Sequence, residues 1–300
     1  MADRDLPDVP APAAAREAAE RSDAQQGAPA PYVAKPVRPR RINLALQGGG
    51  THGAFTWGVL ERLLEDDRLD IDGVSGTSAG AINAAILVQG LAEGGREGAI
   101  RALGRLWRDV ATRLAFSPLQ NTPWEKALWG HDLSRSVAYQ TFDFVIRAFS
   151  QYQFNPFPIE YNPLRAVIED QLDTAALRRD PKGVRLFISA TNVRTGKPRV
   201  FTRTEVDADA LMASACLPNI FRAVQIDGEA YWDGGYLGNP ALWPLYHEGG
   251  APDILLVQIN AIMRPELPTS ASDIMNRLNE VSFNASLMSE MRAIDFVQRL

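Results

Sequence analysis

The sequence predicts an α/β layer fold, in which strands alternate with helices along the chain. Short apolar runs suited to buried strands are followed by segments whose apolar residues recur at helical spacing. Two of the strand-like runs end in glycine-rich turns that lead directly into a helical segment. This alternation favours a sheet covered by helices. The chain has 300 residues, of which 46% are hydrophobic, so a substantial core in one large or two small domains is expected.

The individual elements follow in order from residue 42. The run INLALQ at 42–47 is short and apolar, as expected of a buried parallel strand. The segment at 54–67 has the spacing of an amphipathic helix, with apolar residues at Phe55, Val59, Leu60, Leu63 and Leu64. The remaining expected elements are a strand at 71–76, a helix at 79–89, strands at 184–193, 224–232 and 253–261, and an amphipathic helix from Ser272.

The two ends of the chain differ in composition from its middle. Residues 1–40 hold 7 of the 20 prolines together with many alanines and charges, which predicts a disordered arm. The main domain is expected at 41–250, and a C-terminal strand and amphipathic helix at 251–300 are expected to pack on it. The last helix runs into Leu300 without glycine, proline or a polar stop, which is typical of a chain shortened from a longer one.

Charge and composition weigh against several classes of protein. The net charge of −5 gives no electrostatic reason to expect nucleic-acid binding, and a single cysteine cannot form an intramolecular disulfide. No run of 18 or more apolar residues is present, so no transmembrane helix is expected, and the N-terminus lacks the apolar segment of a signal peptide. We therefore expect a cytoplasmic protein, with peripheral binding to a membrane surface and the oligomeric state left open.

The glycine loop after the first expected strand allows two interpretations. Gly48, Gly50 and Gly53 fit G-x-G-x-x-G, the pattern of a dinucleotide-binding loop. Such a site also needs an acidic residue at the end of the second strand. Asp70 and Asp72 lie instead before or at the start of that strand.

The second expected strand is followed by GTSAG at 76–80, which fits G-x-S-x-G. A nucleophilic serine projects from a sharp strand-to-helix turn, where glycines such as Gly76 and Gly80 remove clashing β-carbons. The helix that follows places its amide end near Ser78. On a parallel sheet, the glycine loop at the end of the neighbouring strand would lie beside this serine. We therefore interpret the amides of Gly48, Gly49 and Gly50 as an oxyanion hole rather than a phosphate cradle.

A nucleophilic serine also needs a base, and Asp233 is the preferred candidate. The sequence VQIDGEAYW predicts a hairpin that turns at Asp227 and Gly228 and delivers Asp233 to the end of its second strand. An unperturbed aspartate has a pKa near 3.9 and is a poor base, but partial burial would raise that pKa.

The chain has three histidines, and one of them offers a second interpretation. Ser78, Asp233 and His247 follow the chain order of a Ser–Asp–His hydrolase. However, His247 lies in an expected helix end before a strand, which would place it at the opposite edge of the sheet. His52 lies inside the glycine loop and could touch a substrate, whereas a structural or surface role is expected of His131.

Together these motifs resemble the patatin-like phospholipase family, which shows a G-G-G-x-[R/K]-G loop, a G-x-S-x-G turn and a D-G-[A/G] motif in this order. They read GGGTHG at 48–53, GTSAG at 76–80 and DGG at 233–235, and SATNVRTGKP and ASACLPNIF also look like the family. The similarity covers roughly residues 42–250. It implies a three-layer α/β/α fold like cytosolic phospholipase A catalytic domains, with a mostly parallel central sheet, and hydrolysis of lipid acyl esters at a membrane surface.

The resemblance implies a Ser–Asp dyad without histidine, in which Ser78 is the nucleophile and Asp233 the base. It also implies that the Gly49 and Gly50 amides form the oxyanion hole. The chain departs from the family pattern at His52, where the family has Arg or Lys, so the family's headgroup preference does not carry over. A catalytically silent module that binds lipid or nucleotide is the alternative from another class.

No metal or other cofactor is expected, because no cluster of His, Cys or acidic residues has metal-ligand spacing. Cys216 has no apparent histidine partner and is expected to be a small packed residue.

Residues 107–161 hold 12 of the 25 aromatic side chains, which predicts an inserted helical cap. This cap is either an ordinary aromatic core or an apolar wall for an acyl chain. The basic cluster Arg38, Arg40 and Arg41 fits either a solvated linker or a contact with phospholipid headgroups.

Overall fold

The computed structural model describes residues 39–115, 162–179, 183–247 and 250–300, with five single residues between 116 and 161. The chain divides into two units, Met1–Arg38 and Pro39–Leu300, and the description below concerns the second. Residues 1–38 of the expected arm and most of the expected cap at 107–161 lie outside the described residues, whereas Arg40, expected in the arm, begins the first strand.

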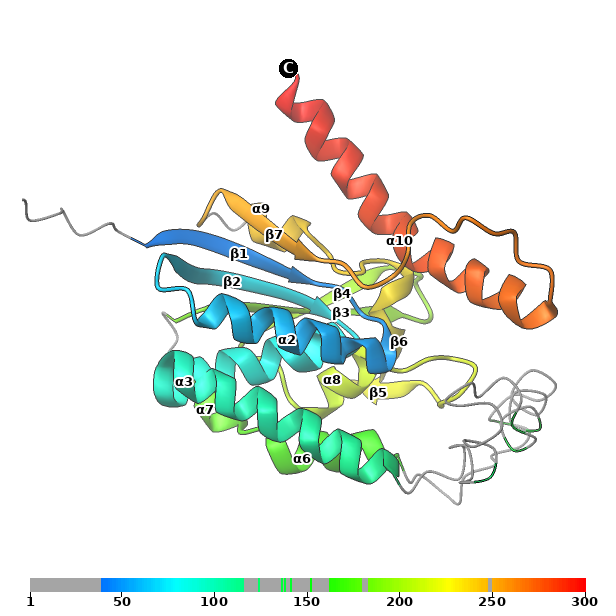
Figure 1. Ribbon diagram of the computed structural model, residues 1–300, viewed down its shortest axis with the longest axis horizontal. Helices are drawn as coiled ribbons and strands as arrows, with labels where there is room; N and C mark the ends of the chain where they lie inside the picture. Colours follow the sequence, from blue (N-terminus) through cyan, green and yellow to red (C-terminus); the bar gives the residue numbers. More distant parts are fainter. Residues whose placement is uncertain are drawn as a thin grey trace, which may run out of the picture. The chain divides into compact units, whose positions relative to one another are not determined.

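The described unit is built on a mixed seven-stranded sheet with a parallel centre (Figure 1). Hydrogen-bonded neighbours follow the path β5-β6-β3-β2-β1-β7, with β4 also paired to β3. The parallel strands are β1 (Arg40–Leu46), β2 (Leu69–Thr77), β3 (Arg185–Asn192) and β7 (Asp253–Val257). Antiparallel pairing adds β4 (Pro198–Thr202), β5 (Val224–Ile226) and β6 (Glu229–Asp233) at the β3 end.

Helices cover both faces of this sheet (Figure 1). Successive side chains of a strand point to opposite faces, so Leu44 and Leu46 of β1 join the larger core cluster while Ala45 joins the smaller one. The larger cluster is covered by α2 (Gly53–Leu64), α3 (Ala79–Ala115), α6 (Pro163–Gln171), α7 (Thr174–Arg179) and α8 (Ala208–Ser214). The smaller one is covered by α9 (Trp243–His247) and α10 (Ala271–Gln298). The expected three-layer α/β/α architecture is thus confirmed.

Helix α3 is longer than the sequence predicts and folds back on itself. Its backbone leaves helical geometry at Gly94 and Gly95, which sit between two helical halves. As a result Trp107 of the second half donates its indole N–H to Asn83 of the first half, at 2.9 Å. Residues 107–115, expected to open the cap, therefore continue α3.

The other predicted elements are present, with shifted ends. Asp227 and Gly228 both have positive φ, 52° and 80°, as the expected hairpin turn between β5 and β6 requires. The last helix begins at Ala271, one residue before the expected start, and β7 ends at Val257 rather than at 261. The sequence analysis did not predict β4, α6, α7 or α8.

Strand β3 aligns the two chain segments that carry the G-x-S-x-G and Asp-Gly-Gly motifs. Thr77, the last residue of β2, pairs with Ser189, and Asp233, the last residue of β6, pairs with Ala190. Strand β4 pairs with one edge of β3. Strands β2 and β6 both pair with the opposite edge of β3, where they follow one another. The residue after Thr77 is therefore brought next to Asp233.

Candidate active site

Ser78 lies in the sharp turn that joins β2 to α3. Its φ of 55° is in the left-handed region, which is unfavourable for a residue with a side chain and often marks a functional site. A β-carbon on Gly76 would come within 2.5 Å of the Gly80 carbonyl oxygen, and one on Gly80 would collide with the Leu46 carbonyl. The glycines of the G-x-S-x-G motif therefore allow the turn to pack against β1.

The strained turn is held from outside by Ser214, at the end of α8. The Ser78 amide donates to Ser214 Oγ at 2.9 Å, and both residues are buried. On the other side, the Ser78 carbonyl accepts from the amides of Ala81 and Ile82, which begins α3. The serine thus sits at the amide end of a long helix, where negative charge is stabilised.

The glycine loop packs directly against this serine. A β-carbon on Gly48 would lie 2.7 Å from Ser78 Cβ, so only glycine allows the two segments to approach this closely. The Gly48 amide donates to Asn239 Oδ1 at 2.7 Å and is not available to a ligand. Within the described part of the chain, the amides of Gly49 and Gly50 have no hydrogen-bond partner, and both residues line the same cavity as Ser78.

Asp233 is completely buried and only half satisfied. Its Oδ1 accepts from the Gly235 amide at 2.7 Å, whereas Oδ2 has no hydrogen-bond partner among the described residues. Burial raises the pKa of this carboxyl to about 7, although the Gly235 amide and the Ser78 hydroxyl both act to lower it. Ser78 is thus near enough to influence the carboxyl without meeting hydrogen-bond geometry, as is common before substrate binds.

The histidines do not join this pair. His247 is exposed at the end of α9, where its ring contacts Trp243 and Tyr246, and it does not line the cavity that contains Ser78. It precedes β7, so it lies toward the amino ends of the parallel strands, as the sequence predicts. His52 is exposed in the glycine loop, with its ring Nδ1 3.2 Å from the Gly49 carbonyl oxygen. His131 lies outside the described residues.

A cavity of about 900 Å³ opens onto Ser78 and Asp233, a size typical of small-molecule sites. Much of its wall is apolar, with contributions from α3, α6 and α10 that include Ile82, Leu106, Trp107, Val167, Met275 and Phe283. Phe283 also packs on the Asp-Gly-Gly turn, because a β-carbon on Gly235 would collide with its ring. The C-terminal helix is therefore one wall of the site.

The residues that a dinucleotide site, a headgroup contact or a thiol nucleophile would require make other contacts or are buried. Asp72, a candidate ribose ligand, pairs with Arg41 and Arg185 away from the glycine loop. Arg40 pairs with Asp253, at 2.9 Å, so two arginines of the basic cluster contact the domain itself. Cys216 is 1% exposed and burial raises its pKa to about 12, which makes it a poor nucleophile.

Sequence reasoning missed the polar residues that hold the motifs in place. Asn239 and Asn260 contact the backbone of Gly48, and Gln47 and Asn284 connect these contacts to α10. Their common signal is an amide side chain that follows or interrupts an apolar run. No local sequence pattern indicates Ser214, because its role depends on a contact between segments 136 residues apart.

The patatin-like phospholipase family matches residues 44–246, which is more than half of the chain. The chain therefore belongs to this family. None of the described helices offers an apolar stretch long enough to cross a bilayer.

The individual proteins that resemble this chain share between 17% and 28% sequence identity with it. The uncharacterized protein YjjU of Escherichia coli is 28% identical over 208 residues, which cover 69% of this chain and 48% of YjjU. The crystal structure of VipD from Legionella pneumophila is similar over 66% of this chain and 46% of VipD, with 17% identity and a TM-score of 0.36. The ExoU–SpcU heterodimer from the type III secretion system of Pseudomonas aeruginosa gives 85% and 52% coverage, 19% identity and a TM-score of 0.32. The chain thus spans about half the length of these relatives.

Proposed function

We propose that the chain is a serine hydrolase that cleaves acyl esters of lipids with a dyad of Ser78 and Asp233. The observation that carries the proposal is the register of β3, which sets the strained serine beside a buried, half-satisfied carboxyl. The two groups meet at the cavity, and membership of the patatin-like phospholipase family supports the same chemistry.

In the first half of the reaction, the Ser78 hydroxyl attacks the ester carbonyl and transfers its proton to Asp233 Oδ2. The tetrahedral intermediate carries a negative charge on the former carbonyl oxygen, and the amides of Gly49 and Gly50 donate to it. Collapse of the intermediate breaks the ester C–O bond, and the alcohol leaves with the proton that Asp233 holds. The acyl group remains bound to Ser78 as an ester.

In the second half, a water molecule attacks the acyl-enzyme while Asp233 takes its proton. The same amides stabilise the second tetrahedral intermediate, which releases the fatty acid and returns the proton to Ser78 Oγ. Burial makes Asp233 suitable for both steps, because a carboxyl with a pKa near 7 is a much stronger base than an exposed aspartate.

The lipid part of the proposal rests on the cavity wall. Apolar side chains from α3, α6 and α10 surround the space next to Ser78, which suits an acyl chain better than a polar substrate. We therefore expect turnover to increase from short-chain to longer-chain esters, and to extend to esters presented in phospholipid vesicles. A peripheral encounter with a membrane surface would supply such substrates.

The test is hydrolysis of a series of p-nitrophenyl esters by the wild type and by Ser78→Ala, Asp233→Asn and His247→Ala variants. The first two substitutions are expected to abolish turnover, since each removes one member of the dyad while retaining similar volume. His247→Ala serves as the matched control and is expected to retain activity, because its side chain is exposed and outside the cavity.

Circular dichroism would confirm that each variant is folded. Loss of activity in His247→Ala would favour the conventional Ser–Asp–His hydrolase. No turnover by any of the four proteins, on esters or on vesicles, would instead favour a silent lipid-binding module.

A further inference from the structure

The two candidate oxyanion donors belong to consecutive peptide groups of the glycine loop. The Gly49 amide shares a planar trans peptide group with the Gly48 carbonyl, so the N–H and the C=O point in opposite directions. Whatever holds the Gly48 carbonyl oxygen therefore sets the direction of the Gly49 N–H. In the same way, the Gly49 carbonyl, which accepts from the His52 amide at 3.3 Å, sets the direction of the Gly50 N–H.

Two asparagines hold the peptide groups on either side of Gly48. Asn260 donates its Nδ2 to the Gly48 carbonyl oxygen at 2.8 Å. Asn239 accepts from the Gly48 amide at 2.7 Å and donates weakly to the same carbonyl at 3.4 Å. A carbonyl oxygen can only accept, so the NH₂ of each side chain must face it. Asn260 makes the shorter contact and is the main anchor of the carbonyl.

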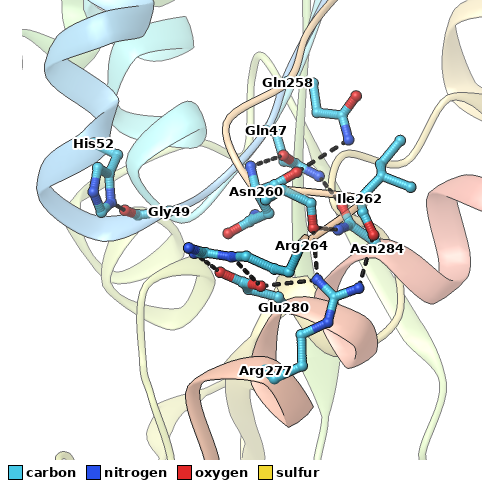
Figure 2. Close-up of polar contacts among 11 residues, drawn as sticks. Gln47, Gly49, His52, Gln258, Asn260, Ile262, Arg264, Arg277, Glu280 and Asn284 are labelled. Atoms are coloured by element: carbon cyan, nitrogen blue, oxygen red, sulfur yellow. Dashed lines mark hydrogen bonds and ion pairs between the residues drawn. The ribbon is translucent and has the colours of Figure 1, made fainter. Parts of the chain in front are cut away.

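Asn260 is itself fixed by a network that extends to α10 (Figure 2). Gln47 Oε1 accepts from the amides of Ile259 and Asn260, at 2.8 and 2.7 Å. Gln47 Nε2 donates to Asn284 Oδ1 of α10 at 2.9 Å, and Asn284 Nδ2 donates in turn to the Ala261 carbonyl at 3.2 Å. Gln47 is fully buried and Asn284 nearly so. Such buried, satisfied networks hold a single geometry.

We propose that Asn260 is a positioning residue of the oxyanion hole, which aims the Gly49 N–H into the active site through the Gly48 carbonyl. The inference rests on the proposed hydrolase function and extends it to a residue beyond 44–246, the part of the chain that matches the family. The loop after β7 and the helix α10 thereby belong to the catalytic apparatus of this chain.

The test compares Asn260→Ala and Asn260→Asp with the wild type in the full chain. Asn260→Asp keeps the shape of the side chain but cannot donate to the carbonyl when ionised. End-point labelling with a fluorophosphonate measures the concentration of reactive Ser78. The values of kcat per labelled site and of KM are then measured on a soluble ester. The affinity of an alkyl boronic acid, which forms a tetrahedral adduct on the serine, is measured in parallel.

Both variants are expected to lose about tenfold or more in kcat per labelled site, with little change in KM. The loss should not exceed that of removing a donor outright, about 10²–10³. The affinity of the boronic acid should fall by a similar factor, since it also depends on the oxyanion donors. A structural role would lower the labelled fraction instead and leave kcat per site unchanged.

Asn43→Ala is the matched control. Asn43 is a fully buried asparagine in the middle of β1, and its Nδ2 likewise donates to a backbone carbonyl, that of Ala251, at 2.7 Å. This variant is expected to lower the melting temperature without changing kcat per labelled site. Unchanged kcat per site in both Asn260 variants would overturn the inference alone, whereas a wild type without turnover would refute the proposed function and the inference with it.

Discussion

At the scale of single residues, the burial of Asp233 is the feature with most consequences. A carboxylate without a neighbouring cation is costly to bury, so the protonated form is favoured and the pKa rises to about 7. The hydrogen bond from the Gly235 amide orients the carboxyl through Oδ1, and Oδ2 has no partner among the described residues, as the proposed transfer of the Ser78 proton requires. One residue is thus both held in place and made basic by its surroundings.

The raised pKa of Asp233 predicts how activity depends on pH. The base must be ionised to take the serine proton, so kcat/KM should rise with pH and reach half of its maximum near pH 7 rather than near pH 4. The measurement is kcat/KM on a soluble ester from about pH 5 to about pH 9. Thermal melts over the same range serve as the control for unfolding. A flat profile would contradict the assignment of a buried Asp233 as the base.

Much of the candidate site could be predicted from local sequence, because each motif is a turn with its own chemistry. Gly76, Ser78 and Gly80 describe a strand-to-helix turn within five residues, and Asp233 ends a recognisable hairpin. Asn260 and Asn284 could not be predicted, since asparagine is common in loops and helices and their partners are 212 and 237 residues away. Similarly, the sequence does not distinguish Gly48 from Gly49 and Gly50, although the Gly48 amide donates to Asn239.

At the scale of elements, helix α2 offers two glycines with opposite roles. Gly58 is exposed in the helix interior, and a β-carbon there would meet nothing within 4 Å. Gly53 is buried at the helix start, and a β-carbon there would lie 2.9 Å from Ala79 Cβ and 3.0 Å from the Trp107 ring. The same substitution therefore has opposite expected effects at the two positions.

Gly58→Ala is expected to increase the free energy of unfolding by about 0.5–1 kcal/mol, because alanine loses less backbone entropy than glycine in a helix. Gly53→Ala is expected to reduce it, since α2 and α3 would have to separate. Urea denaturation of both variants measures the two changes. If the two substitutions shifted the free energy of unfolding equally, the close packing of α2 on α3 would be refuted.

Elements with a clear hydrophobic pattern could be predicted from the sequence, whereas short elements without such a pattern could not. The buried parts of β1 and β3 are mostly apolar, which is typical of parallel strands covered on both faces, whereas β2 is recognised by the G-x-S-x-G turn that follows it. Strand β4 has five residues and carries exposed Pro198 and Arg199, so nothing in its pattern distinguishes it from a loop. Helix α3 was predicted too short because its glycines suggest an end, whereas the chain turns there and continues as a helix.

At the scale of the whole molecule, the single cysteine provides a probe of opening. Cys216 is 1% exposed, burial raises its pKa to about 12, and its thiol donates to the Arg222 carbonyl at 3.1 Å. Both access and deprotonation therefore require the structure around β6 to open. We expect N-ethylmaleimide to react far more slowly with the folded protein than with the protein in denaturant.

Mass spectrometry over a time course measures this reaction, and every thiol adduct reports Cys216 because the chain has one cysteine. A destabilised variant such as Gly53→Ala should react faster in proportion to its loss of stability, if labelling requires global unfolding. Labelling at equal rates in the wild type and this variant would show instead that the region around Cys216 opens locally.

The pairing of β7 with β1 has a consequence for anyone who would shorten the chain. A fragment that ends near residue 246, where the family match ends, would lack β7 and leave the β1 side of the sheet open. The backbone groups of Ile42–Leu46 that now pair with β7 would become an unprotected edge on a strongly apolar strand. Such edges recruit strands from other molecules, so the fragment is expected to aggregate. The shortest fragment that does not aggregate must therefore include β7, the strand that pairs with β1, and not only the residues that match the family.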